Sequence, residues 1–157
     1  MLSSSPLGRT IQVLLVEDNL GDVELTKLAL EESKLRVNLS VVGDGVAALE
    51  FLHSQQQGNP HTLYPDLILL DLNLPKQSGH EVLAAIKADR SLKRIPVVVL
   101  TTSQAEEDIL RAYDHYASGY IAKPASFDRF VQVVQSIEDY WFSTVRLPSE
   151  LGIGDRG

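Results

Sequence analysis

Five short, largely apolar runs alternate along this chain with longer segments of helical periodicity. The runs lie at residues 11–16, 37–42, 66–70, 96–100 and 119–122. Such alternation is typical of βαβ units, in which parallel strands form one sheet and helices connect them. Right-handed crossovers then place helices on both faces of the sheet. The pattern predicts a doubly wound α/β domain with a five-stranded parallel sheet.

The segments between and after these runs predict five helices. We expect them near residues 21–33, 45–55, 79–89, 104–115 and from 127 to beyond 141. Residues 1–10 are rich in Ser and predict a disordered N-terminal arm, and residues 147–157 predict a flexible tail. Residues 11–146 are then expected to form a single domain, which suits a chain of 157 residues.

Composition excludes several classes of function. Hydrophobic residues make up 44% of the chain, which is enough for a packed core. The net charge of −7 argues against binding to a nucleic-acid backbone, which needs clustered Lys and Arg. The chain has no Cys, so disulfides and thiol nucleophiles are excluded, and a cytoplasmic location fits. The sequence predicts neither a signal peptide nor a membrane span.

Motifs for two other kinds of site are missing from the sequence. No Gly-rich loop follows the first apolar run, which argues against binding of dinucleotides or nucleoside triphosphates. The four histidines show no metal-ligand spacing, and we expect all of them on the surface: His53, His61, His80 and His115.

Four of the apolar runs end in chemically reactive side chains. These are Glu17 and Asp18 after the first run, Asp71 after the third, Thr101 after the fourth and Lys123 after the fifth. In a parallel sheet the carboxyl ends of the strands share one edge, where such folds bind ligands. Three acids, a hydroxyl and an ammonium are therefore expected to converge, and this set suits Mg²⁺ and a phosphoryl group.

The acidic pair after the first run has a simpler interpretation, because Asp18 or Asn19 could cap the helix that follows. The neighbouring strand favours a different interpretation, since Asp71 at its end would bring two or three carboxylates together. Such crowding is unfavourable unless a cation or a proton offsets it. Mg²⁺ suits the position, because it takes oxygen ligands and usually keeps several waters. We therefore interpret the acids as a magnesium site.

The other strand-end residues also have alternatives. Asp71 could be a turn residue, but a continuous apolar run delivers it to the sheet edge, where a carboxylate can accept a phosphoryl group. Thr101 could equally be a helix cap or a hydroxyl donor to a phosphoryl oxygen. Lys123 would ordinarily be a solvated charge, yet the residue before Pro124 is held extended, and its ammonium at this edge would offset phosphoryl charge.

Over about residues 11–141, the chain resembles the receiver domain of bacterial two-component response regulators. The matching residues, each at a strand end, are Glu17, Asp18, Asp71, Thr101, Tyr120 and Lys123 with Pro124. The resemblance implies a flavodoxin-like strand order, 2-1-3-4-5, and Asp71 as the phospho-acceptor. It also implies Thr101 and Tyr120 as the switch pair, and the backbone carbonyl of Asn73 as a further Mg²⁺ ligand, with Asp18 the more direct ligand of the acidic pair.

A narrower resemblance concerns the long polar loop before the third run and the ending at residues 136–148. Both are similar to the single-domain regulators that serve cyanobacterial phytochromes. The resemblance implies a phytochrome histidine kinase as the phosphodonor. The product would be a modified protein, so we expect a signalling switch rather than an enzyme. Because few residues follow the last helix, we expect no DNA-binding output domain.

Two other interpretations stay open. An aspartyl-phosphate phosphohydrolase on a similar fold would need a second aspartate two residues after the nucleophile. That residue is Asn73 here, which cannot act as a general acid. The second alternative is an interaction module with a receiver-like fold that is not phosphorylated. The intact set of acids, hydroxyl and lysine argues against it.

The last helix ends in three aromatic residues. At 100° per residue most of its apolar side chains form one stripe that packs on the sheet, with Tyr140 at its edge and Phe142 well outside it. An exposed Phe142 beside Tyr140 and Trp141 would form an apolar patch, which often marks a binding surface. In receivers the face of the fourth helix, fifth strand and fifth helix commonly mediates dimers. We therefore expect a homodimer through this face.

Overall fold

The computed structural model describes residues 10–32, 36–56 and 64–144. The expected tail and all of the expected arm except Thr10 lie outside these residues, and Thr10 already belongs to the first strand. The strands are β1 (Thr10–Val16), β2 (Arg36–Val42), β3 (Leu67–Leu70), β4 (Val97–Thr101) and β5 (Gly119–Ala122). The helices are α1 (Leu20–Glu31), α2 (Gly45–Gln56), α3 (Gly79–Ala88), α4 (Glu106–Asp114), α5 (Phe127–Asp139) and the π-helical η3 (Tyr140–Thr144).

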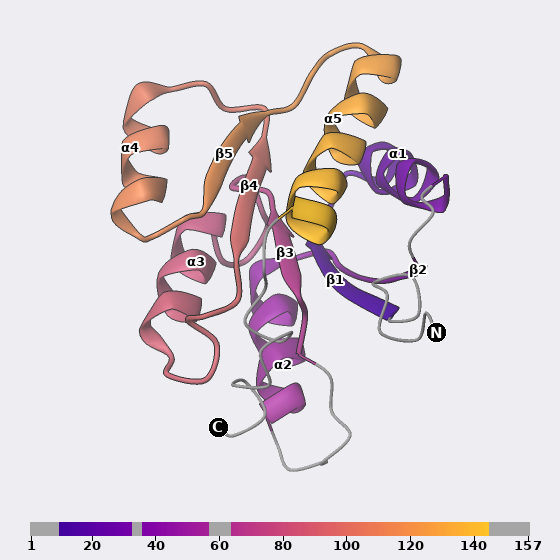
Figure 1. Ribbon diagram of the computed structural model, residues 1–157. Helices are drawn as coiled ribbons and strands as arrows, with labels where there is room; N and C mark the ends of the chain where they lie inside the picture. The colour runs from indigo at the N-terminus through magenta and orange to yellow at the C-terminus, as the bar shows by residue number, and fades with distance from the viewer. Residues whose placement is uncertain (1–9, 33–35, 57–63, 145–157) are drawn as a thin grey trace.

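The five strands form one parallel sheet in the order β2-β1-β3-β4-β5, which confirms the predicted topology. Val16 pairs with Leu70, and Leu70 pairs with Val99, so β1, β3 and β4 end side by side. Their carboxyl ends lie at the top of the view in Figure 1. The residues that follow these strands are thereby brought to one edge.

Helices cover both faces of the sheet (Figure 1), with α2, α3 and α4 on one face and α1 and α5 on the other. Successive strand residues point to opposite faces. Leu14 and Val16 therefore pack with residues of α2 and α3, whereas Val13 and Leu15 pack with Ile137 of α5. Burial on both faces explains why the strands are continuous apolar runs. None of the described helices has the length and apolar character to cross a membrane.

The structure corrects the prediction that Phe142 is exposed. Phe142 is 5% exposed and packs in the same core cluster as Ile137. The reason is the π-helical turn η3, which begins at Tyr140: its hydrogen-bond spacing differs from that of an α-helix, so the 100° rule does not hold at Phe142. Tyr140 is exposed, and the half-buried Trp141 meets its ring edge-on at a centroid distance of 5.4 Å.

The structure also corrects the prediction that the histidines lie on the surface. His53 is exposed and His115 is half-buried, whereas His61 lies outside the described residues. His80 is only 6% exposed. It lies three residues before the buried Leu83 on α3, and residues at this spacing share one face of a helix, which here is the packed face.

Candidate functional site

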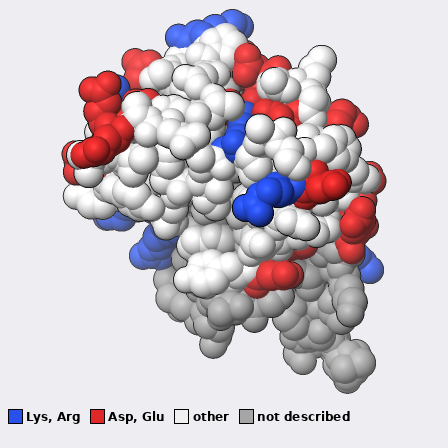
Figure 2. Space-filling model, turned by 90° about the horizontal axis from the view of Figure 1, so that it is seen from above, with Lys and Arg blue, Asp and Glu red and all other residues white. Residues whose placement is uncertain are grey.

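Three carboxylates meet at the carboxyl edge of the sheet. Oxygen atoms of Glu17, Asp18 and Asp71 lie within 4.8 Å of one another. Glu17 and Asp71 are buried and Asp18 is exposed. In the view from above, Asp and Glu side chains lie on several sides of this edge, with basic atoms near the middle of the face (Figure 2). The helix cap is Asn19, whose Oδ1 accepts the N–H of Asp22 at 2.9 Å, so capping does not engage Asp18.

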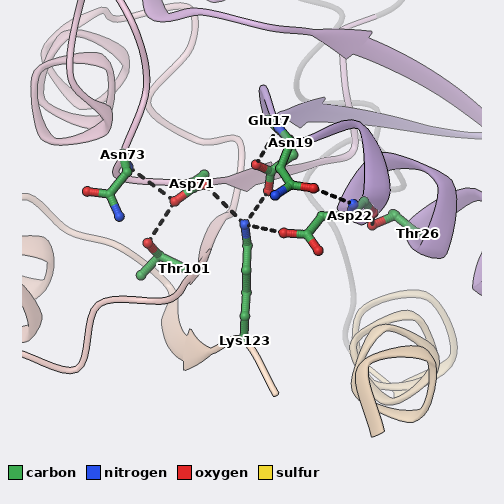
Figure 3. Close-up of polar contacts among 8 residues, drawn as sticks. All are labelled: Glu17, Asn19, Asp22, Thr26, Asp71, Asn73, Thr101 and Lys123. Carbon is green, nitrogen blue, oxygen red and sulfur yellow. Dashed lines mark hydrogen bonds and ion pairs between the residues drawn. The ribbon is translucent and has the colours of Figure 1, made fainter. Parts of the chain in front are cut away.

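Lys123 is the cation at the centre of this cluster (Figure 3). Its Nζ atom lies 2.6 Å from Oε1 of Glu17, 2.8 Å from Oδ2 of Asp22 and 3.1 Å from Oδ2 of Asp71. The side chain is 5% exposed, so these contacts are shielded from water. An ammonium has three hydrogens to donate, and the three acids accept all of them. The peptide bond between Lys123 and Pro124 is trans.

Asp71 is held by donors on both carboxylate oxygens (Figure 3). The Thr101 hydroxyl donates to Oδ1 at 2.7 Å, and the backbone N–H of Asn73 donates to the same atom at 3.1 Å. Lys123 donates to Oδ2. Burial opposes ionisation of Asp71, but these hydrogen bonds and the charge of Lys123 outweigh it and hold the pKa below its usual value. Asp71 is thus an ionised carboxylate in a fixed orientation.

The pocket carries more negative than positive charge. Burial, and to a lesser degree the charge of Asp71, raise the pKa of Glu17 to about 7, although the hydrogen bond from Lys123 opposes this. For Lys123, burial favours the neutral form, but hydrogen bonds to Asp22 and Glu17 prevail and raise its pKa. One ammonium therefore serves several carboxylates. This arrangement can hold a divalent cation, which would offset the excess charge.

Gly79, the first residue of α3, fixes the backbone beside Asp71. Its N–H donates to the carbonyl of Leu72 at 3.0 Å. A Cβ atom at this position would lie 2.3 Å from the carbonyl oxygen of Asp71, so only glycine permits this approach. The start of α3 is therefore packed directly against the backbone of Asp71.

The structure brings Glu17, Asp18, Asp71, Thr101 and Lys123 together as predicted, with Asp22 as one further member. Tyr120 is half-buried against the core, and its hydroxyl donates to the backbone carbonyl of Ser103 at 2.9 Å, in the loop after Thr101. Asp22, the third acid on Lys123, was missed from the sequence. An acid in the first turn of a helix is expected for the helix dipole alone, so its spacing from Asn19 carried no separate signal.

Comparisons with known proteins agree with this geometry. The family model of the response regulator receiver domain matches residues 13–135. Response regulator Rcp1 of Synechocystis sp. is 46% identical over 138 residues, which are 87% of this chain and 92% of that protein.

Solved structures show the same relationship. The phosphorylated cyanobacterial phytochrome response regulator RcpA has a TM-score of 0.83 and 47% identity, over 89% of this chain and 99% of that one. The Mn²⁺-bound form of Rcp1 has a TM-score of 0.80 and 46% identity, over 88% and 99%. The chain therefore belongs to the response regulator receiver domain family.

Proposed function

We propose that this protein is a signalling switch in which Asp71 accepts a phosphoryl group from the histidine of a sensor kinase. The observation that carries the proposal is the environment of Asp71: a buried, ionised carboxylate that accepts from Thr101 and Lys123 beside two further acids. A merely structural aspartate would not need a surplus of neighbouring acids, since these oppose one another.

The residues of the pocket supply the nucleophile and the hydrogen-bond donors for this transfer. A carboxylate oxygen of Asp71 attacks the phosphorus of the phosphohistidine, and the P–O bond forms as the P–N bond breaks. The imidazole nitrogen leaves with the bonding electrons. The low pKa of Asp71 makes proton abstraction from the nucleophile unnecessary. Thr101 and Lys123 then donate to phosphoryl oxygens, so catalysis consists of positioning and electrostatics.

The acidic pocket fits a divalent cation, which we propose to be Mg²⁺. Asp18, Asp71 and the backbone carbonyl of Asn73 would hold it, with Glu17 acting through water. Both oxygens of Glu17 are already engaged, one with Lys123 and one with the backbone N–H of Asn19 at 3.1 Å. A bound cation would offset the negative charge of the transferring group. The Mn²⁺-bound relative Rcp1 supports a divalent ion here.

We infer that the phosphodonor is a phytochrome histidine kinase and that the protein meets it in the cytoplasm. The relative RcpA is a phytochrome response regulator, and it is 47% identical to this chain. The product of the reaction is the modified chain itself, so we propose a switch rather than an enzyme. Asn73 stands where a phosphohydrolase of this kind would need a general acid.

We also propose a homodimer through α4, β5 and α5. Exposed apolar side chains lie on these elements, among them Leu110 and Tyr113 of α4 and Tyr140 after α5. Tyr140, which is exposed, takes the place of the buried Phe142 in this proposal, beside the half-buried Trp141. Tyr140→Glu should shift the protein toward monomer in sedimentation at micromolar concentration, with Val46→Glu on α2 as the control. A wild type that is monomeric with and without phosphate contradicts the dimer.

Intact mass spectrometry after incubation with Mg²⁺ and acetyl phosphate tests the phosphorylation. We expect the wild type to gain one phosphoryl group, Asp71→Asn to gain none, and the control Asp114→Asn to behave like the wild type. A stable adduct supports the switch, fast release of phosphate indicates a phosphohydrolase, and no adduct indicates an interaction module. Phosphotransfer from phytochrome kinases and from unrelated kinases under matched conditions then tests the partner.

A further inference from the structure

A chain of polar contacts connects two helices, a loop and a strand beside the proposed switch. Nε2 of the buried His80 lies 3.1 Å from Oδ1 of Asp108, in the first turn of α4. Oδ2 of Asp108 accepts the hydroxyl of Ser103 at 2.5 Å. The carbonyl of Ser103 in turn accepts the hydroxyl of Tyr120. A carboxylate can only accept, so the proton of this histidine link lies on Nε2. The contacts join α3 to α4, the β4–α4 loop and β5.

The histidine end of this chain is anchored at the phospho-acceptor. His80 follows Gly79, whose backbone packs against the carbonyl of Asp71 and donates to Leu72. His80 is therefore the first side chain to project from the junction between Asp71 and α3.

Helix α4 has few other ties at this end. Its N-cap residue, Ala105, makes no side-chain capping bond, and within α4, all of which the structure describes, Ala112 alone is buried. Leu110 and Tyr113 of this helix are exposed. The link from His80 to Asp108 is thus a specific tether at the start of a lightly packed helix.

A purely packing role for His80 fits the structure poorly. Its second ring nitrogen, Nδ1, is buried without a hydrogen-bond partner among the described residues. A buried, unsatisfied polar atom is unfavourable, so an apolar side chain of similar size would pack better. The hydrogen bond from Nε2 to Asp108 explains why an imidazole, and not an apolar side chain, occupies this position.

We propose that His80 is a positioning residue that ties α4 and the β4–α4 loop to the acceptor site and thereby sets the position of Tyr120. The proposal deepens, and rests on, the proposed function, in which Thr101 and Tyr120 form the switch. Thr101 leads directly into the loop that carries Ser103. Phosphorylation would pull the Thr101 hydroxyl toward the phosphoryl oxygens. The link from His80 to Asp108 then limits how far the loop can move, and with it the Ser103 carbonyl that accepts the Tyr120 hydroxyl.

Fluorine NMR of the full chain with fluorotyrosine at Tyr120 tests this role. His80→Phe keeps a buried ring and removes the donor, and we expect a shifted Tyr120 resonance before phosphorylation and a smaller change after it. His80→Gln, whose amide can donate from a similar place, should restore the wild-type resonance, and His53→Gln is the surface control. Phosphorylation of Asp71, read by intact mass, should persist in every variant.

Asp108→Ala breaks the same link from its accessible side and keeps the test valid if His80→Phe does not fold. It should shift the Tyr120 resonance, whereas Asp114→Ala should not. A wild-type resonance in His80→Phe or Asp108→Ala overturns the proposal, and so does a failure of His80→Gln to restore it, which would indicate packing alone. A wild type that gains no phosphoryl group contradicts the proposed function. The role of His80 is still tested in that case, because the Tyr120 resonances before phosphorylation are compared separately.

Discussion

The ammonium of Lys123 lies 2.6 Å from Oε1 of Glu17, and both side chains are at most 5% exposed. The same ammonium contacts Asp71 and Asp22, so one buried cation holds the ends of β1, β3 and β5 and the start of α1 together. This single side chain links the stability of the pocket to its chemistry.

Replacing Lys123 should therefore destabilise the fold. Without the ammonium, Glu17 and Asp71 are left buried side by side, and breaking a buried ion pair typically costs about 3 kcal/mol or more. We expect Lys123→Met to lose about this much free energy of unfolding in a chelator and to recover part of it in Mg²⁺. Urea unfolding with and without Mg²⁺ measures both effects. A loss no larger than that of Lys27→Met, at an exposed ion pair, contradicts the expectation.

Metal affinity should depend more on Asp18 than on Glu17. The oxygens of Glu17 are engaged by Lys123 and Asn19, whereas Asp18 is exposed at the pocket. A unit charge about 4 Å away contributes about 1 kcal/mol even in water, and the ion carries two charges. Asp18→Asn should therefore weaken Mn²⁺ binding roughly tenfold or more in titration calorimetry. Equal effects of Asp18→Asn and Glu17→Gln would remove Asp18 as the direct ligand.

Thr101→Ala should leave phosphorylation intact but prevent its effect from reaching Tyr120. The Thr101 hydroxyl is fully buried and donates to Asp71, but it is not the nucleophile, and losing one such bond costs about 1 kcal/mol. The variant should still gain a phosphoryl group by intact mass. It should lose the phosphorylation-dependent change at Tyr120 in fluorine NMR, whereas the exposed neighbour variant Thr102→Ala should keep it. A wild-type change of the Tyr120 resonance in Thr101→Ala would contradict the proposed coupling between Thr101 and Tyr120.

Gly79→Ala should slow phosphorylation and lower stability. The added methyl group would lie 2.3 Å from the carbonyl of Asp71, so the acceptor or α3 must shift, and overpacking of this kind costs about 1–3 kcal/mol. Gly43→Ala is the matched control, because a Cβ atom there meets nothing within 4 Å. Thermal unfolding and the rate of adduct formation with acetyl phosphate measure the two effects. Equal behaviour of the two variants would show that the close approach is dispensable.

Two of the three aromatic residues of η3, Phe142 and Tyr140, should respond differently to truncation. Phe142 is buried and Tyr140 is exposed, so Phe142→Ala should lower the free energy of unfolding by about 3–5 kcal/mol and Tyr140→Ala by well under about 1 kcal/mol. Denaturant unfolding of both variants at one concentration compares them. If Tyr140→Ala proves the more destabilising change, the π-helical placement of Phe142 is wrong.

The strand order followed from the resemblance of the sequence to receiver domains. The sequence pattern alone determined the parallel sheet, the sheet edge that carries the site, and the convergence there of Glu17, Asp18, Asp71, Thr101 and Lys123. The physical reason is local: continuous apolar runs bury both faces of a parallel sheet, and the residue after each run must then lie at the common edge.

Tertiary structure alone decided three other features. Asp22 accepts a hydrogen bond from Lys123 across a sequence separation of 101 residues, and an acid at the start of a helix does not by itself indicate such a partner. His80 is buried because α3 turns its face toward α4, which depends on packing between helices rather than on the residue itself. Phe142 is buried because the end of α5 widens into a π-turn, and a phase computed for an α-helix fails wherever the hydrogen-bond spacing changes.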